Sequence, residues 1–389
     1  MTESAAAPPA ESGIRVSTLE LFFDLVFVFT VTQLTWTLAE DVTLAALADV
    51  LLMLFVIWWM YSGYAWLTNA VAPDSSTRRT LLLAGMAGFL VMALAVPESF
   101  GEYGWLFGVS YLVVNLVHSA LFLHAGAGSR QAAKQLAPLN ILAAVLVLAG
   151  GLLPEPYRHL CWIAAPLVQI TAGHVHNLEL HQIRAGHFVE RHGLVMIVAI
   201  GESIVAIGLG FRDVRLDQGT IPVAVLGLCI AYYLWWIYFA GDDQRSEHVL
   251  ARTTDPRRRA RLAVDGWGYA HYVMVLGIVV LAAGIKKTVG HAFEPLHWGE
   301  AIAVGGGVAL YQVGHAAFLL RLGLQGWAHR AVAALVVLAT IPLGHVLAVG
   351  QLAAIPLIMA AAAIIEDLPG VRRAGGSTAI SDFGRTPGS

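Results

Sequence analysis

Apolar residues occur along this chain in long blocks, and short polar segments separate one block from the next. Most blocks are about 20 residues long, which is the length an α-helix needs to cross a hydrocarbon layer of about 30 Å. The pattern predicts an all-α polytopic membrane protein with about twelve transmembrane helices; eleven is the alternative, because little more than Gly350 separates the last two blocks. The predicted spans cover residues 19–38, 45–68, 80–97, 103–123, 138–153, 159–176, 190–210, 220–240, 267–285, 299–320, 331–349 and 351–366.

Composition supports a membrane environment, with the lipid bilayer as the main partner of the chain. Of the 389 residues, 58% are hydrophobic and 13% are charged, whereas about 25% of residues in soluble domains are charged. Both cysteines, Cys161 and Cys229, fall inside apolar blocks, so neither a disulfide framework nor a CxxC metal site is expected. The polar ends, residues 1–17 and 367–389, are predicted to be disordered tails.

Basic residues predict the orientation of the chain. With twelve spans both ends lie on one side, and that side receives 18 of the 23 Lys and Arg residues. Because positive residues are retained in the cytoplasm, both termini are predicted to be cytoplasmic in a multi-pass protein of the cell (cytoplasmic) membrane. Residues 241–266 then form a basic cytoplasmic loop, which we interpret as a topology determinant and not as a site for nucleic acid. The opposite side holds Arg158, Arg212, Arg215, Lys286 and Lys287.

The two halves of the chain resemble each other, which predicts an internal repeat. Six helices return the chain to its starting side, so the two six-helix repeats, residues 18–178 and 190–366, would be parallel. Residues 179–189 would form a cytoplasmic connector between them. The matched positions are Glu20 with Glu190, Trp58-Trp59-x-Tyr61 with Trp235-Trp236-x-Tyr238, Asn115 with Gln312, His118 with His315, and Pro166 with Pro356.

Several titratable and amide side chains lie inside the apolar blocks, where a charged group costs roughly 2.5–3.5 kcal/mol on insertion scales. Glu20 and Asp24 are four residues apart and share one helix face, and Glu202 lies near the middle of its block. A buried carboxylate binds a proton or pairs with a polar partner, so we expect these groups to face the bundle interior. The candidate proton, cation or substrate site comprises Glu20, Asp24, Gln33, Asn115, His118, Glu190, Arg191, Glu202, Ser203, His271, Gln312 and His315.

Two other interpretations of the polar residues stay open. Each polar side chain could simply form a hydrogen bond between helices, which contributes about 0.6 kcal/mol to stability on average. Alternatively, the segment "GHVHNLELHQIRAGHFVERH" could hold zinc or a pair of iron ions through His174, His176, Glu179, His181 and His187. Its spacing matches neither HExxH nor a helical ExxH pair, so no cofactor is predicted and a metal remains the alternative.

Three segments of the chain resemble the bacterial low-temperature-requirement A (LtrA) membrane proteins. They are "LELFFDLVFVFTVTQLT", "HFVERHGLVMIVAIGESIVAIG" and "YAHYVMVLGIVVLAAG", and the similarity extends from about residue 15 to 366. The resemblance implies a membrane fold, and it implies no settled substrate or reaction. The family pattern falls on Glu20, Phe23, Asp24, Gln33, His187, Glu190, Arg191, Gly201, Glu202, Ser203 and His271.

The sequence favours a proton- or cation-coupled secondary transporter or permease for an unidentified small molecule, with a carboxylate and histidine site between the halves. The Trp-Trp-x-Tyr segments could line a substrate cavity or form interfacial belts. No nucleotide-binding motif occurs, so direct ATP-driven transport is not expected. The alternatives are an intramembrane enzyme that acts on a lipid or prenyl substrate through the His/Glu cluster, or a non-catalytic stress-response membrane factor. The sequence specifies neither the substrate nor the oligomeric state.

Overall fold

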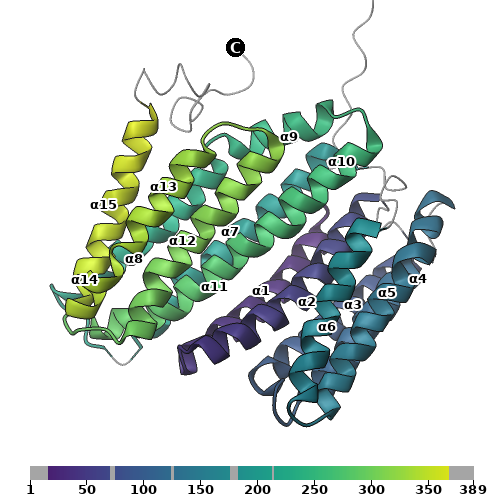
Figure 1. Cartoon of the computed structure of the whole chain (residues 1–389), viewed down its shortest axis with the longest axis horizontal. Coiled ribbons are helices and arrows are strands. Elements are labelled where there is room, and N and C mark those ends of the chain that lie inside the picture. Colours follow the sequence, from purple (N-terminus) through teal and green to yellow (C-terminus); the bar gives the residue numbers. More distant parts are fainter. Residues whose placement is uncertain (1–15, 71–74, 124–126, 176–182, 213, 368–389) are drawn as a thin grey trace, which may run out of the picture.

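The structure is a computed structural model that describes residues 16–70, 75–123, 127–175, 183–212 and 214–367 (Figure 1). Within these ranges every regular element is helical. The first half contains α1 (Thr18–Glu40), α2 (Leu44–Ala70), α3 (Ser76–Ala95), η1 (Val96–Glu98), α4 (Gly104–Leu123), α5 (Ala127–Leu152) and α6 (Tyr157–Val175). The second half contains α7 (Ala185–Gly210), α8 (Thr220–Phe239), α9 (Asp242–Arg252), α10 (Pro256–Ala263), η3 (Val264–Ala270), α11 (His271–Thr288), η4 (Val289–His291), α12 (Trp298–Leu322), α13 (Trp327–Leu338), α14 (Ile341–Val346) and α15 (Ala348–Asp367).

The described part of the chain has eleven helices that are long and apolar enough to cross a membrane. Each of the twelve predicted spans corresponds to helical structure, but α6, the sixth, is not among the eleven. Its sequence carries Arg158, His159 and Gln169 among its apolar residues, and these polar side chains lower its mean hydropathy. The protein is therefore a multi-pass helical membrane protein in which α6 is the least apolar long helix.

Two boundaries differ from the sequence-based expectation. Residues 241–266 were expected to form a loop, whereas most of them are helical, in α9, α10 and η3. The last two spans are separated at Leu347, which has an extended backbone, and Gly350 lies inside α15. The basic residues of the first segment resembled a loop because short polar helices carry no hydrophobic signal. Gly350 resembled a break between two spans because glycine is a poor helix former.

The two halves of the chain form two groups of helices that lie side by side, with α1 and α2 facing α7 and α11 (Figure 1). In the first group, α1 packs on α2 and α3, α2 on α4 and α6, α3 on α4, α4 on α5, and α5 on α6. In the second group, α7 packs on α8 and α11, α8 on α12 and α15, α11 on α12, α12 on α13, and α13 on α15.

Close helix contacts depend on glycines at the points where backbones meet. At Gly151 of α5, a Cβ atom would collide with the backbone of Gly104 in α4. At Gly277 of α11, a Cβ would lie 2.7 Å from the carbonyl oxygen of Gly307 in α12. Small residues of this kind let helices approach closely in membranes, where van der Waals packing is the main attraction between them.

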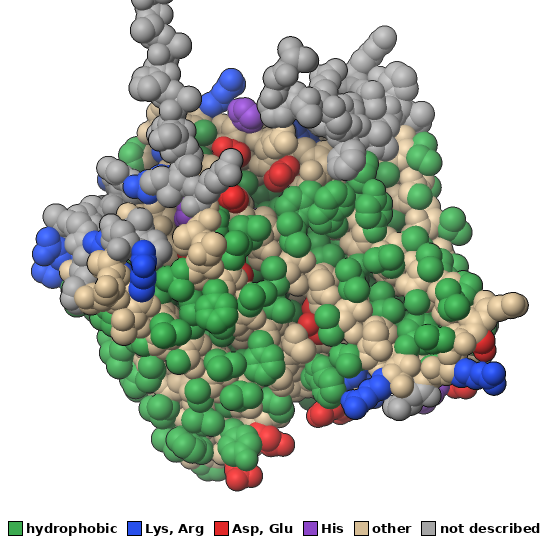
Figure 2. Space-filling view, turned by 180° about the vertical axis from the view of Figure 1, so that it is seen from behind, with side chains coloured by type: hydrophobic (Ala, Val, Ile, Leu, Met, Phe, Trp, Pro, Cys, Tyr) green, Lys and Arg blue, Asp and Glu red, His purple; other side chains and the backbone are tan. Residues whose placement is uncertain are grey.

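On the face drawn in Figure 2, many hydrophobic side chains lie across the middle and most charged side chains gather toward the two ends. Leu25, Leu83 and Leu357 are among the large apolar side chains that are more than half exposed. Many exposed apolar side chains between charged ends indicate contact with lipid. Buried acidic and basic side chains therefore stand out as exceptions that need partners inside the bundle.

Candidate functional site

The first polar cluster lies where α1, α2 and α7 meet, and α1 begins there with a capping box. The backbone N–H and the hydroxyl of Ser17 each donate to Glu20 Oε2 at 2.8 Å, and the Ser17 hydroxyl accepts from the Glu20 backbone N–H. This cap fixes one carboxylate oxygen of Glu20 at the helix start. The other oxygen, Oε1, is buried and turned toward α7.

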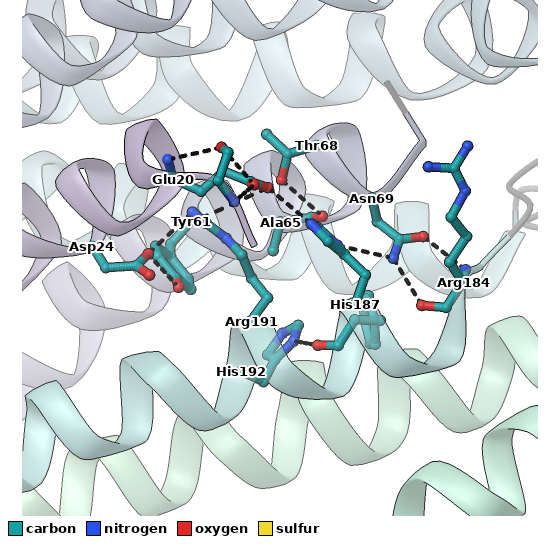
Figure 3. Close-up of polar contacts among 12 residues, drawn as sticks. Glu20, Asp24, Tyr61, Ala65, Thr68, Asn69, Arg184, His187, Arg191 and His192 are labelled. Carbon is teal, nitrogen blue, oxygen red and sulfur yellow. Dashed lines mark hydrogen bonds and ion pairs between the residues drawn. The ribbon is translucent and has the colours of Figure 1, made fainter. Parts of the chain in front are cut away.

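Arg191 of α7 lies between the two carboxylates of α1 (Figure 3). Its Nη2 is 3.0 Å from Asp24 Oδ1, and its Nη1 is 3.9 Å from Glu20 Oε1. One guanidinium can face both acids because residues four apart occupy the same helix face. The ring centres of Phe23 and Tyr61 lie 5.7 Å and 5.9 Å from the guanidinium carbon, Cζ. The Arg191 side chain is only 1% exposed.

Tyr61 of α2 completes the surroundings of Asp24. Its hydroxyl donates to Asp24 Oδ1 at 2.9 Å, so this single oxygen receives both the tyrosine and the arginine. The second oxygen, Asp24 Oδ2, is buried and has no hydrogen-bond partner among the described residues. A buried carboxylate oxygen in that condition is available to a proton or a cation.

Asn69 of α2 lies against the His187 ring (Figure 3). The Asn69 amide exchanges two hydrogen bonds of 2.9 Å with the backbone of Arg184, which fixes its Nδ2 as the amino group. That amino group lies 3.3 Å from His187 Nδ1. The other ring nitrogen, Nε2, lies 3.3 Å from Glu20 Oε1.

The charges of this cluster do not balance. Two carboxylates, Glu20 and Asp24, face one guanidinium, and the His187 ring lies beside Glu20. All four side chains are at most 7% exposed. The cluster therefore carries one excess negative charge unless a carboxyl group or the imidazole binds a proton, and a buried excess charge is costly. The arrangement can hold a single monovalent positive charge.

A second polar contact joins α1 to α7 further along both helices. The hydroxyl of Thr32 donates to Glu202 Oε2 at 2.6 Å, while Glu202 Oε1 is buried and no residue in the described part of the chain forms a hydrogen bond with it. The neighbouring Ser203 is also buried, and its hydroxyl oxygen has no partner in the described structure. Lys286 of α11 is within electrostatic range of Glu202. Glu202 thus faces the helix bundle, as the sequence indicated.

The other predicted site residues lie in separate places. Asn115 donates to the Tyr111 carbonyl oxygen at 2.8 Å in α4, and Gln312 Nε2 donates to the Tyr233 hydroxyl at 3.3 Å in the second half. His118 packs against Tyr64, with ring centroids 5.2 Å apart. The structure therefore keeps the matched amides in their own halves.

The histidines of α11 and α12 belong to the second half. His271 donates from Nδ1 to the Gly266 carbonyl oxygen at 2.9 Å and accepts from the Tyr238 hydroxyl at Nε2, 2.8 Å away. His315 Nε2 lies 3.2 Å from Asp242 Oδ2, and both side chains are buried. Asp242 was expected in a solvated loop, but α9 places it inside the bundle.

One expectation for α7 is wrong. Glu190, matched in sequence with Glu20, is exposed, whereas Glu20 is buried. The reason is the helix face, because Glu190 precedes Arg191 and points away from the cluster. Thr37 of α1 donates to the carbonyl oxygen of Gln33 in its own helix. The half-buried Gln33 side chain makes none of the contacts described above.

The proposed metal ligands fall mostly outside the described residues. His176, Glu179 and His181 lie there, as does the side chain of His174. The structure describes the fifth candidate, His187, and Asn69 and Glu20 occupy its ring nitrogens. Among the described side chains, no group of three or more His, Cys, Asp and Glu is arranged to hold a metal ion.

Sequence reasoning missed three residues that define the polar contacts. Thr32 and Asn69 are uncharged and carry no motif, so neither could be distinguished from other polar residues of α1 and α2. Tyr61 belongs to the repeated Trp-Trp-x-Tyr segment, and that repeat could have marked it as a candidate. Its contact with Asp24 could not be predicted from the sequence.

Comparison with known proteins identifies the family. The profile described as "Bacterial low temperature requirement A protein (LtrA)" matches residues 15–364. The chain belongs to the LtrA family. An uncharacterized protein of Rhizobium meliloti (strain 1021) is 29% identical over 313 residues, which cover 77% of this chain and 76% of that protein. The resemblance seen in the sequence is confirmed, and both polar contacts between α1 and α7 lie inside the matched region of this LtrA protein.

Proposed function

We propose that this LtrA protein is a proton- or cation-coupled secondary transporter or permease of the cytoplasmic membrane. The observation that carries the proposal is the buried first polar cluster, in which Glu20 and Asp24 share the single guanidinium of Arg191. A site that is short of one positive charge inside a membrane protein binds a proton or a monovalent cation. Intramembrane groups of this kind are typical of ion and proton pathways.

The packing of the helices supports a duplicated architecture for this transporter. If α7, α8, α11, α12, α13 and α15 correspond to α1 through α6 in order, each helix pair given above for the first group has a counterpart in the second. We infer that the halves are parallel repeats with both termini in the cytoplasm, as the distribution of basic residues predicts. The polar contacts of α1 with α7 then lie between the halves.

The second contact lies between the first polar cluster and a polar cavity at the far ends of α1, α7 and α11. The cavity has a volume of about 490 Å³, and Trp36, Glu40, Lys286 and His291 are among its lining residues. Lys286 Nζ lies 3.5 Å from the centre of the Trp36 ring. Three sites follow one another along α1. Asp24 lies in the first polar cluster, Thr32 contacts Glu202, and Trp36 lines the cavity. We propose that a proton or cation passes between the two ends by way of Glu202.

Proton flux into liposomes tests the proposal. Wild-type protein and the variants Glu202→Gln and Glu190→Gln are reconstituted with an entrapped pH dye. An inward proton driving force is then imposed with potassium and valinomycin, with and without a panel of small organic cations and anions. In Glu202→Gln, the side-chain amide oxygen can still accept the hydrogen bond from the Thr32 hydroxyl, but the side chain cannot bind and release a proton. Glu190 is exposed, so Glu190→Gln is the matched control.

We expect faster acidification with wild-type protein than in protein-free liposomes, at least a tenfold slower rate in Glu202→Gln, and a wild-type rate in Glu190→Gln. Acidification at the protein-free rate under every condition would contradict the proposal. Wild-type flux in Glu202→Gln would remove Glu202 from the pathway and leave only the first polar cluster.

A further inference from the structure

An aromatic cavity of about 90 Å³ lies between the two halves of the molecule. Its wall is formed by α2, α4, α5 and α6 on one side and by η3 and α11 on the other. The aromatic side chains that carry the argument are Phe55, Trp58, Trp59, Trp66, Tyr269 and Tyr272. Trp58 and Trp59 of the first Trp-Trp-x-Tyr segment thus line the cavity, whereas Tyr61 of the same segment contacts Asp24 in the first polar cluster.

Hydrogen bonds hold the indole rings of Trp58 and Trp59 in place. Trp58 Nε1 donates to the carbonyl oxygen of Gly268 at 2.7 Å, and Trp59 Nε1 donates to Asn140 Oδ1 at 3.1 Å. Phe55 stacks on Trp59 with ring centroids 6.1 Å apart. Because both indole N–H groups are occupied, these rings offer a ligand their π-electrons and no hydrogen-bond donor.

An unusual backbone supplies the opposite wall. Residues Val264–Ala270 form a π-helix between α10 and α11, and Gly268 and Tyr269 of this segment reach the cavity. π-Helical segments are rare and frequently occur at functional sites. The wide turn places the Gly268 carbonyl against Trp58, so the two halves are joined at the cavity.

The charges around the cavity favour a cation. Among the described residues that line it, none is Asp, Glu, Lys or Arg. Trp58 connects it to the first polar cluster, because its ring stacks on Tyr61 at 5.4 Å and the Tyr61 hydroxyl donates to Asp24. That cluster places two carboxylates around one guanidinium, and water screens their charges little in a buried site. An anionic ligand would meet no Lys or Arg among the described lining residues, and the indole N–H groups of Trp58 and Trp59 are already occupied.

We propose that the aromatic cavity binds the ammonium group of a small organic cation, as a trimethylammonium group is held among aromatic rings. The cavity is smaller than the roughly 150 Å³ cavity that holds benzene, so it takes a headgroup of about five heavy atoms and not a drug-sized molecule. The inference rests on the proposed function, because it names the substrate class of the same transporter and uses the excess charge of its ion site.

Binding to the purified full-length protein in detergent tests the inference without requiring transport. The probe is tritiated choline in a scintillation proximity assay, displaced by unlabelled choline or by dimethylbutanol, in which a neutral carbon replaces the quaternary nitrogen. The variants are Trp59→Leu, Trp59→Phe, Asp24→Asn and, as the matched control, Trp105→Leu, whose side chain on α4 is exposed. Size-exclusion profiles establish that each variant is folded.

We expect saturable choline binding that dimethylbutanol displaces at least tenfold less effectively. Trp59→Leu should weaken choline binding about tenfold, and Trp59→Phe, which keeps a ring, about threefold. Asp24→Asn should weaken choline binding severalfold and leave the affinity for dimethylbutanol unchanged, because it removes only charge. Trp105→Leu should bind as the wild type does.

Three results would overturn the inference. Equal displacement by the two compounds would make the cavity a site for neutral apolar molecules. Unchanged binding in Trp59→Leu would place choline elsewhere, and no saturable binding at millimolar choline would exclude the ligand class. These outcomes differ from failure of the proposed function, in which choline binds with the expected pattern while proton flux stays at the protein-free rate.

Discussion

Replacement of Arg191 by methionine should destabilise the protein far more than loss of an exposed arginine. Methionine retains most of the volume of the side chain but leaves Glu20 and Asp24 without the guanidinium that they share at 3.9 Å and 3.0 Å. Breaking a buried ion pair by removing one partner costs about 3–5 kcal/mol, because the remaining charge is buried and uncompensated. Two carboxylates on one helix face would add their mutual repulsion.

The matched control is Arg321→Met. Arg321 Nη1 lies 3.7 Å from Asp265 Oδ2, but the arginine side chain is 64% exposed. An exposed pair of this kind contributes about 0–1 kcal/mol. The free energy of unfolding can be measured for both variants by titration with SDS in mixed micelles, with tertiary structure followed by near-ultraviolet circular dichroism.

A third variant separates charge from packing. Asp24→Asn combined with Arg191→Met removes one carboxylate together with the guanidinium, and it should recover about half of the loss or more. Equal losses in Arg191→Met and Arg321→Met would refute the reasoning, since they would mean that burial adds nothing to the value of the pair. A double variant as unstable as Arg191→Met alone would show that packing, and not charge, is responsible.

Three further predictions follow from single contacts. Thr32→Val removes the 2.6 Å hydrogen bond to Glu202, so the free energy of unfolding in the same SDS titration should fall by about 1–3 kcal/mol. Gly151→Ala should cost about 1–3 kcal/mol because its Cβ meets the backbone of α4, whereas Gly208→Ala, with nothing within 4 Å of its Cβ, should be neutral or stabilising by up to about 1 kcal/mol. Mass spectrometry of protein purified without chelator should find zinc and iron well below one atom per chain, because Asn69 and Glu20 already contact both ring nitrogens of His187. A stoichiometric metal would contradict this prediction and favour the intramembrane enzyme.

The helices were largely predictable because the apolar blocks report on the local environment of each segment. A block of about 20 apolar residues is stable across a bilayer as a helix whatever it packs against, since a helix satisfies its own backbone hydrogen bonds. For the same reason the sequence could single out Glu20, Asp24 and Glu202, because a carboxylate in an apolar block is costly regardless of its partners.

The partners themselves were not predictable, because they depend on which helix faces meet. The matched residues Glu20 and Glu190 differ completely in burial, and Asp242 is buried although its segment was expected to be solvated. A rotation of one residue, about 100° around a helix axis, moves a side chain from the interior to the lipid or water. Sequence spacing fixes the faces of one helix but not the orientation of that helix relative to its neighbours.

By itself, the sequence determined that the chain is a helical membrane protein, where its long apolar helices run, and that Glu20, Asp24 and Glu202 need polar partners. Only the tertiary structure decided that Glu20 and Asp24 share Arg191, that Thr32 meets Glu202, and that aromatic rings of both halves enclose one cavity. The physical reason is that the cost of burying a polar group is a property of its own segment, whereas the compensation comes from side chains that folding brings in from other helices.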